Sequence, residues 1–95
     1  MSNRYAANFL RKLRNDIPVD KVIIDFLNLE ARHLNNILRF RCPLCGNFHT
    51  ATNDKTNLAR CFDCKVNFNP IDLIMTVEKC SFIDAVERLK KSIDQ

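Results

Sequence analysis

Apolar residues recur three or four positions apart near the N-terminus, which is the spacing of one face of a helix. The first such set comprises Tyr5, Phe9, Leu10 and Leu13. It predicts an amphipathic helix over residues 3–14, with Ser2 as its N-cap and the segment "NDIP" as its end. A second set predicts another helix over about residues 19–29 and comprises Val19, Val22, Ile23, Phe26 and Leu27.

The pattern changes to alternation in the middle of the chain. In "ILRFRC", Leu38 and Phe40 point to one side of a predicted strand. Arg39 and Arg41 point to the other side, so the strand has one basic face. The stretches "FHTAT" and "NLARCF" predict two more strands, joined by the polar turn "NDKTN". Three short strands of this kind form a ribbon.

Two helices are predicted after the ribbon. Asn69 is placed to cap the first helix, with Pro70 at its first position and Asp72 in its first turn. Ser81 is placed to cap the second, whose apolar face comprises Phe82, Ala85, Val86, Leu89 and Ile93. Three aromatic residues are assigned to the hydrophobic core, namely Phe40, Phe68 and Phe82.

These elements together predict a small α+β fold. Residues 1–36 form an N-terminal helical segment, and residues 37–95 form a ribbon of about three short antiparallel strands with two C-terminal helices. A chain of 95 residues, 46% of them apolar, is long enough for one compact domain with a single core. One glycine and three prolines argue against a disordered linker or a glycine-rich phosphate loop.

Charge is distributed unevenly along the chain, although the net charge of +4 is ordinary for a small domain. Residues 1–41 contain eight Lys and Arg against four Asp and Glu. The first fourteen residues contain no acid and carry the cations Arg4, Arg11, Lys12 and Arg14. This helix presents either a solvated face or a face that contacts phosphates.

No apolar run approaches the length that spans a bilayer, and the N-terminus lacks the features of a secretory signal. We therefore expect a cytoplasmic protein without a membrane partner, in which thiols stay reduced. Five cysteines, an odd number, then favour metal binding over disulfides.

Four cysteines form two Cys-x-x-Cys pairs with fifteen residues between them, long enough for two strands and a turn that bring the pairs together. The predicted ligands of one structural Zn²⁺ are Cys42, Cys45, Cys61 and Cys64. All four zinc positions are then filled by protein, which leaves none for a substrate. Iron in a rubredoxin-like site, two disulfides and a thioredoxin-like redox pair are the alternatives. Cys80 is interpreted as a small buried apolar residue, and His49 as a ribbon surface residue or a replacement ligand.

The stretches "FRCPLC", "ARCFDC" and "NPIDLIMTVEKCSFIDAVERL" resemble, over about residues 37–90, the CHC2-type zinc-binding domain of bacterial and phage DNA primases. Cys45 stands where cellular primases have histidine, whereas phage helicase–primases use four cysteines. The segment "KVNFN" replaces the glycines usual after the second pair. The resemblance implies a ribbon that binds the template strand. We expect no catalytic residues here, so the chain would act with a catalytic primase domain or replication protein.

Single-stranded DNA is bound by cations that contact phosphates and by aromatic faces that stack on bases. The predicted DNA-binding residues are Arg39, Arg41, Phe48, His49, Lys55, Arg60, Phe62 and Lys65. Phe62 is assigned equally to packing and to base contact. Two other functions stay open: a protein-interaction module with an exposed apolar patch on the helix "FIDAVERLKKSI", and an iron-dependent electron-transfer protein.

Overall fold

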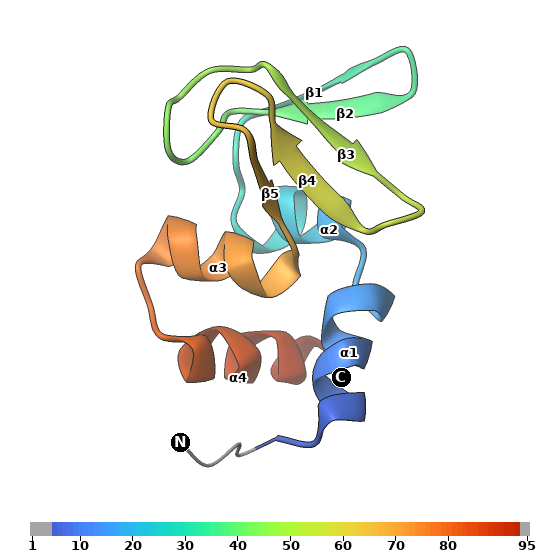
Figure 1. Cartoon of the computed structure of the whole chain (residues 1–95), viewed down its shortest axis with the longest axis vertical. Coiled ribbons are helices and arrows are strands. Elements are labelled where there is room, and N and C mark those ends of the chain that lie inside the picture. The colour runs from blue at the N-terminus through green and yellow to red at the C-terminus, as the bar shows by residue number, and fades with distance from the viewer. Residues whose placement is uncertain (1–4, 94–95) are drawn as a thin grey trace.

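The structure, a computed structural model of the chain, describes residues 5–93, without the side chain of Ile93. The expected cap Ser2, the cation Arg4 and the apolar side chain of Ile93 lie outside the described part. The elements run in the order α1 (Ala7–Asp16), α2 (Val19–Lys21), η1 (Val22–Phe26), β1 (Ala31–Leu34), β2 (Ile37–Phe40), β3 (Thr50–Asn53), β4 (Leu58–Cys61), β5 (Val66–Phe68), α3 (Pro70–Glu78) and α4 (Phe82–Ile93). The strands lie at one end of the elongated molecule, with α1 and α4 at the other (Figure 1).

Both predicted N-terminal helices are present, with shifted bounds. α1 begins at Ala7 and buries Leu10 and Leu13. α2 continues directly into the π-helix η1, in which the backbone N–H of Leu27 donates to the carbonyl of Val22 five residues earlier. The left-handed backbone of Asn28, with φ of 50°, then ends the helical path.

β1 and β2 form an antiparallel hairpin that the sequence analysis had predicted only in part. Leu34 pairs with Ile37, and the two residues between them, Asn35 and Asn36, both have positive φ. This is the backbone that a two-residue hairpin turn requires, and asparagine tolerates it better than most residues. β2 is the predicted basic strand, whereas β1 falls in the segment expected to be helical.

The second sheet has the order β3–β4–β5 and is antiparallel throughout. β3 and β4 are the two strands predicted from "FHTAT" and "NLARCF", and β5 is an additional strand. Ala51, Arg60 and Asn67 lie directly opposite one another across the three strands. The α+β class is therefore confirmed, with five strands within residues 5–93 instead of about three.

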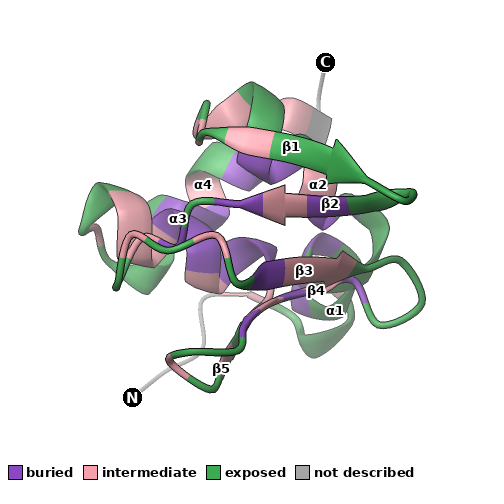
Figure 2. Ribbon diagram, turned by 90° about the horizontal axis from the view of Figure 1, so that it is seen from above, coloured by how far each residue is buried: buried purple, intermediate pink, exposed green. Residues whose placement is uncertain are grey.

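β2 and β3 lie side by side without a shared backbone ladder (Figure 2). The buried hydroxyl of Thr50 joins them instead: it accepts from the backbone N–H of Phe40 at 2.8 Å and donates to the Phe40 carbonyl at 2.6 Å. The guanidinium of Arg39 adds a bond to the Thr50 carbonyl at 2.8 Å. The side chains of Thr50 and Arg39 thus link the two sheets.

The C-terminal helices begin where the sequence predicts. The side chain of Asn69 accepts from the backbone N–H of Asp72 at 2.8 Å, and the Asp72 carboxylate accepts from the Asn69 N–H at 3.1 Å. This reciprocal pair is a capping box. The hydroxyl of Ser81 accepts from the Asp84 N–H at 3.1 Å at the start of α4. A left-handed Lys79, with φ of 52°, ends α3.

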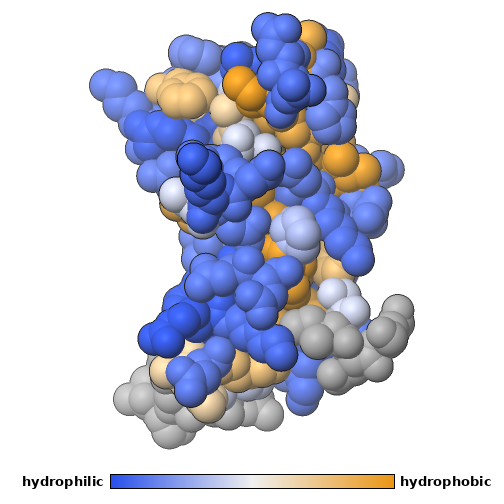
Figure 3. Space-filling model, turned by 90° about the vertical axis from the view of Figure 1, so that its right-hand side faces the viewer, coloured by the Kyte–Doolittle hydropathy of each residue, from blue (hydrophilic) through white to orange (hydrophobic). Residues whose placement is uncertain are grey.

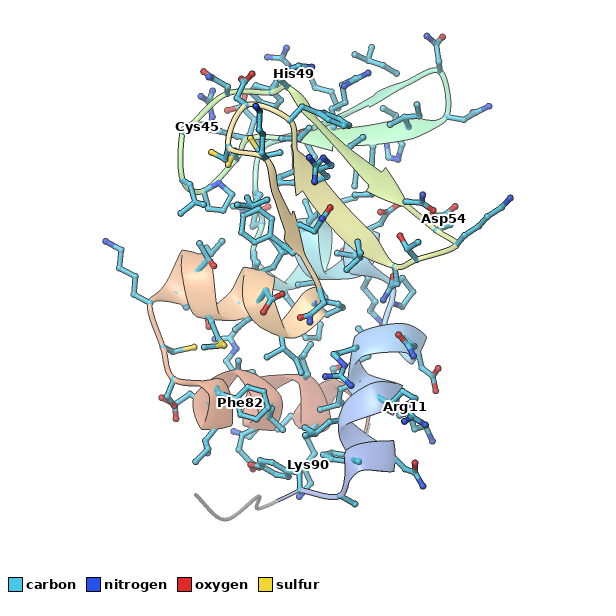
Figure 4. The ribbon with its side chains drawn as sticks, viewed as in Figure 1. Arg11, Cys45, His49, Asp54, Phe82 and Lys90 are labelled. Atoms are coloured by element: carbon cyan, nitrogen blue, oxygen red, sulfur yellow. The ribbon has the colours of Figure 1, made fainter. Side chains whose placement is uncertain are left out.

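One hydrophobic core joins the helices to both sheets. Its buried members are Leu10, Leu13, Ile17, Val19, Val22, Ile23, Leu38, Phe40, Ala59, Phe68, Ile71, Leu73, Ile74, Ala85, Val86 and Leu89. The assignment of Phe82 to this core was wrong, because its side chain is 38% exposed. Phe82 is the first residue of α4 (Figure 4), and burial on that helix begins one turn later, at Ala85.

Candidate metal centre and ribbon surface

The first cysteine pair follows β2 in a tight turn. Gly46 adopts φ of 79°, and its backbone N–H donates to the carbonyl of Cys42 at 2.8 Å. The N–H of Cys42 in turn donates to the carbonyl of Asn47 at 2.9 Å. The backbone N–H of Leu44 points at the Cys42 sulfur, 3.4 Å away. The turn therefore directs the thiols of Cys42 and Cys45 to the same side.

The second pair lies between β4 and β5 and has a similar geometry. Cys61 is the last residue of β4, and its sulfur accepts from the backbone N–H of Cys64 at 3.4 Å. Lys65 then adopts φ of 58°, a conformation that favours glycine, and returns the chain into β5. The glycine-poor segment noted in the sequence therefore still forms the turn.

The four sulfur atoms lie within 4.8 Å of one another. The Cys42 and Cys64 sulfurs are 3.9 Å apart, and those of Cys45 and Cys61 are 3.7 Å apart. A tetrahedral zinc ion with Zn–S bonds of about 2.3 Å separates its ligands by about 3.8 Å. The residues therefore fit one structural Zn²⁺. They supply all four ligands, so the ion would hold the two turns together without an open position for catalysis.

The pKa values of the thiols reflect this crowding. Burial, together with hydrogen bonds between thiols, raises the pKa of Cys64 to about 12. Burial acts on Cys61 in the same sense, but the backbone N–H of Cys64 and the neighbouring thiols donate hydrogen bonds to its sulfur and lower its pKa to about 7. Four adjacent thiolates repel one another, and a bound dication would compensate for their charge.

His49, the possible replacement ligand, and Cys80, the fifth cysteine, both lie outside this sulfur cluster. His49 directs Nδ1 to the Asp63 carboxylate at 2.9 Å. The half-buried thiol of Cys80 packs at the edge of the core, with its sulfur 3.8 Å from the carbonyl of Ile74. Cys80 thus packs against the core, half-buried and not fully buried as expected.

Aromatic and polar side chains surround the second cysteine turn. Asp63 accepts from the Asn47 amide at 3.1 Å as well as contacting His49, and these contacts lower its pKa. The rings of His49 and Phe62 are 5.1 Å apart, and the guanidinium of Arg60 lies 5.6 Å from the Phe62 ring centre. Phe62 is 40% exposed, so part of its ring is accessible to a ligand.

A second group of stacked side chains lies beside the first cysteine turn. The guanidinium groups of Arg32 and Arg41 lie 4.3 Å and 4.9 Å from the centre of the Phe48 ring. Arg41 also pairs with Glu30 at 2.9 Å and donates to the Gly46 carbonyl at 2.9 Å. Its charge is therefore partly compensated within the protein.

The eight predicted DNA-binding residues do not form one group. Five lie in the two groups just described, namely Arg41, Phe48, His49, Arg60 and Phe62. Arg39 is half-buried and bonded to Thr50, and Lys65 is exposed beside the second cysteine turn. Lys55 lies in the β3–β4 turn with Asp54, at the opposite end of that hairpin from Cys45 and His49 (Figure 4).

Sequence reasoning missed Arg32 and Asn67 as surface residues of the ribbon. Arg32 lies on β1, directly opposite Arg39. Its signal was the pair Asn35–Asn36 between two four-residue segments, the pattern of a hairpin. Asn67 lies on β5, a strand of three residues, which is too short for a period-2 pattern to reveal.

The chain matches the model of a known protein family. The family model described as CHC2 zinc finger matches residues 5–95, almost the whole chain. The protein therefore belongs to the CHC2 zinc finger family of DNA primases. A search against curated proteins found no significant match. No helix among residues 5–93 is both long and apolar enough to cross a membrane.

Proposed function

We propose that this member of the CHC2 zinc finger family is a zinc-stabilised module that binds single-stranded DNA and acts with a catalytic primase domain or another replication protein. Family membership supports a primase-like zinc module. Because the four cysteines form a closed ligand set, the proposed metal has a structural role. Catalysis of primer synthesis is then assigned to the partner, and template binding to this chain.

The observation that carries this proposal is the alternation of cations and aromatic rings on the ribbon. Arg60, Phe62 and His49 form one stack, and Arg32, Phe48 and Arg41 form another. Proteins that bind single strands stack bases on aromatic faces and contact phosphates with neighbouring cations. Both stacks adjoin the cysteine turns, so the metal would fix their orientation.

The cations of the two stacks differ in their availability. Within the described part of the chain, Arg60 makes no hydrogen bond or ion pair, whereas Arg41 is paired with Glu30. A phosphate near Arg41 would have to compete with that carboxylate. Arg60 and the exposed Lys65 are therefore the cations most available to the DNA strand in this proposal.

Fluorescence anisotropy of labelled single-stranded DNA, titrated with zinc-loaded protein at several salt concentrations, tests the proposal. Binding should weaken as salt rises, with a logarithmic slope of about −0.7 for each phosphate contacted. Phe62→Ala should reduce affinity roughly 5- to 100-fold, the range for loss of one stacking contact. Phe82→Ala is the matched control, because Phe82 is 38% exposed, against 40% for Phe62, and lies on α4.

Two outcomes would contradict the proposal: no binding of single strands at low salt, or equal losses in the Phe62 and Phe82 variants. The second candidate function is protein docking through α4. It is favoured by Phe82 and Ile83, which are adjacent and each 38% exposed. If DNA binding is absent, pull-down of a catalytic primase domain by the wild type and by Phe82→Ala becomes the informative measurement.

A further inference from the structure

A groove of about 390 Å³ lies on the outer face of the β3–β4–β5 sheet. Its lining comprises Ala51, Thr52, Asn53, Thr56, Leu58, Arg60, Phe62 and Asn67. The volume is within the range of roughly 300–1,000 Å³ that small-molecule sites occupy. On β4, Ala59 and Cys61 are buried, so the alternate residues Leu58 and Arg60 point outward into the groove.

The floor of the groove follows from the size of the side chains across the sheet. Ala51, Arg60 and Asn67 are cross-strand partners in one row. Ala51, at one end of this row, has only a methyl group as its side chain and therefore leaves a space there. Phe62, the residue after the last residue of β4, borders that space. The groove is thus a hollow beside an aromatic ring and not a flat sheet surface.

Four polar groups in the groove have no hydrogen-bond partner among the described residues, namely the guanidinium of Arg60, the amide of Asn67 and the hydroxyls of Thr52 and Thr56. Arg60 and Asn67 face each other from adjacent strands. Asn53 differs, because its side-chain oxygen already accepts from the backbone N–H groups of Lys55 and Thr56. The Arg60–Asn67 pair therefore presents several free donors and one free acceptor side by side.

We propose that this groove binds a single unstacked purine base of the DNA strand, with Phe62 stacking on the base and Arg60 and Asn67 recognising its edge. The inference rests on the proposed function and adds a base preference to it. Arginine matches the N7 and O6 acceptors of guanine, and asparagine matches N6 and N7 of adenine. Pyrimidines lack N7 and offer a smaller face for stacking.

The test uses the zinc-loaded chain of residues 1–95 and a short labelled oligothymidylate carrying one central dG, dA or dC. A single purine should tighten binding roughly 5- to 100-fold relative to the all-thymidine strand, the discrimination given by one bidentate contact. Asn67→Ala and Arg60→Lys should each reduce this preference. The all-thymidine affinity should stay unchanged in Asn67→Ala, because the amide is assigned to base recognition alone. Asn8→Ala, an exposed asparagine on α1, is the matched control.

The outcomes separate this inference from the proposed function. If all strands bind equally well, or if Asn67→Ala keeps the full purine preference, the groove assignment is overturned while single-strand binding stands. If no strand binds at low salt, both are overturned. Circular dichroism of each variant checks that its fold is retained. Asn67→Ala is expected to retain it, because the substitution leaves the backbone of Asn67 paired in the β4–β5 ladder.

Discussion

Replacing Asn57 with alanine should destabilise the folded protein by about 4 kcal/mol, because this side chain joins the ribbon to the N-terminal helices. Its Oδ1 accepts from the backbone N–H of Val19 at 2.8 Å. Its amide donates to the carbonyls of Arg14 and Ile17 at 2.6 Å and 2.7 Å. Asn57 is 8% exposed, so water cannot readily replace these partners.

The magnitude follows from two terms. Three hydrogen bonds of this kind contribute about 1 kcal/mol each, which gives about 3 kcal/mol. Asn57 also has φ of 55°, and a left-handed backbone costs alanine roughly 1 kcal/mol. A chain of this length has a total stability of roughly 5–14 kcal/mol. The predicted loss is therefore a large fraction of the total free energy of unfolding.

Urea unfolding followed by circular dichroism measures this loss, with zinc in excess so that metal release does not contribute. Asn53→Ala is the control, because its side chain caps the same turn on the exposed surface and should cost under about 1 kcal/mol. Asn57→Gly removes the same hydrogen bonds, but glycine adopts the left-handed backbone without cost. Its free energy of unfolding should therefore fall by about 3 kcal/mol. Equal stabilities of the Asn53 and Asn57 variants would refute this account.

Three further results are expected from the same unfolding assay or from zinc titration. Phe68→Ala should cost about 3–5 kcal/mol and Phe82→Ala under about 1 kcal/mol, because only Phe68 is buried; similar losses would contradict the assignment. Lys65→Gly should leave the free energy of unfolding unchanged or raise it by up to about 1 kcal/mol, because glycine adopts a positive φ without strain. A clear loss of stability would show that the lysine side chain itself stabilises the fold. Zinc should be released as pH falls, because protons compete with the metal for the thiolates and the pKa of Cys64 is raised to about 12. A chromogenic chelator measures the released zinc. A zinc affinity independent of pH would exclude thiolate ligation.

Features set by neighbours in sequence were predictable. The capping box of Asn69 and Asp72 and each Cys-x-x-Cys turn span only four residues, so their chemistry can be read locally. The spacing of the two cysteine pairs likewise predicted that they meet, because a hairpin was the simplest path between them.

Features that depend on distant contacts were not predictable. Asn57 bonds to residues about forty positions earlier, and no local pattern marks it. Phe82 continues the apolar stripe of α4, but its exposure depends on where burial against the rest of the protein begins. The pairing of Arg41 with Glu30 also required the β1–β2 hairpin, whose first strand was not foreseen.

The link through Thr50 has a consequence for changes in chain length. A backbone ladder transmits any shift of register along its full length, whereas the Thr50 hydroxyl and the Arg39 guanidinium join the sheets at one point, around Thr50. On the side of the molecule that presents the hairpin tips, hydrophilic side chains cover most of the surface (Figure 3). Residues inserted between Asn35 and Asn36 would extend into solvent and leave the β3–β4–β5 sheet in register. The tip of the β1–β2 hairpin is thus a natural place to attach a fluorophore or a tethered domain.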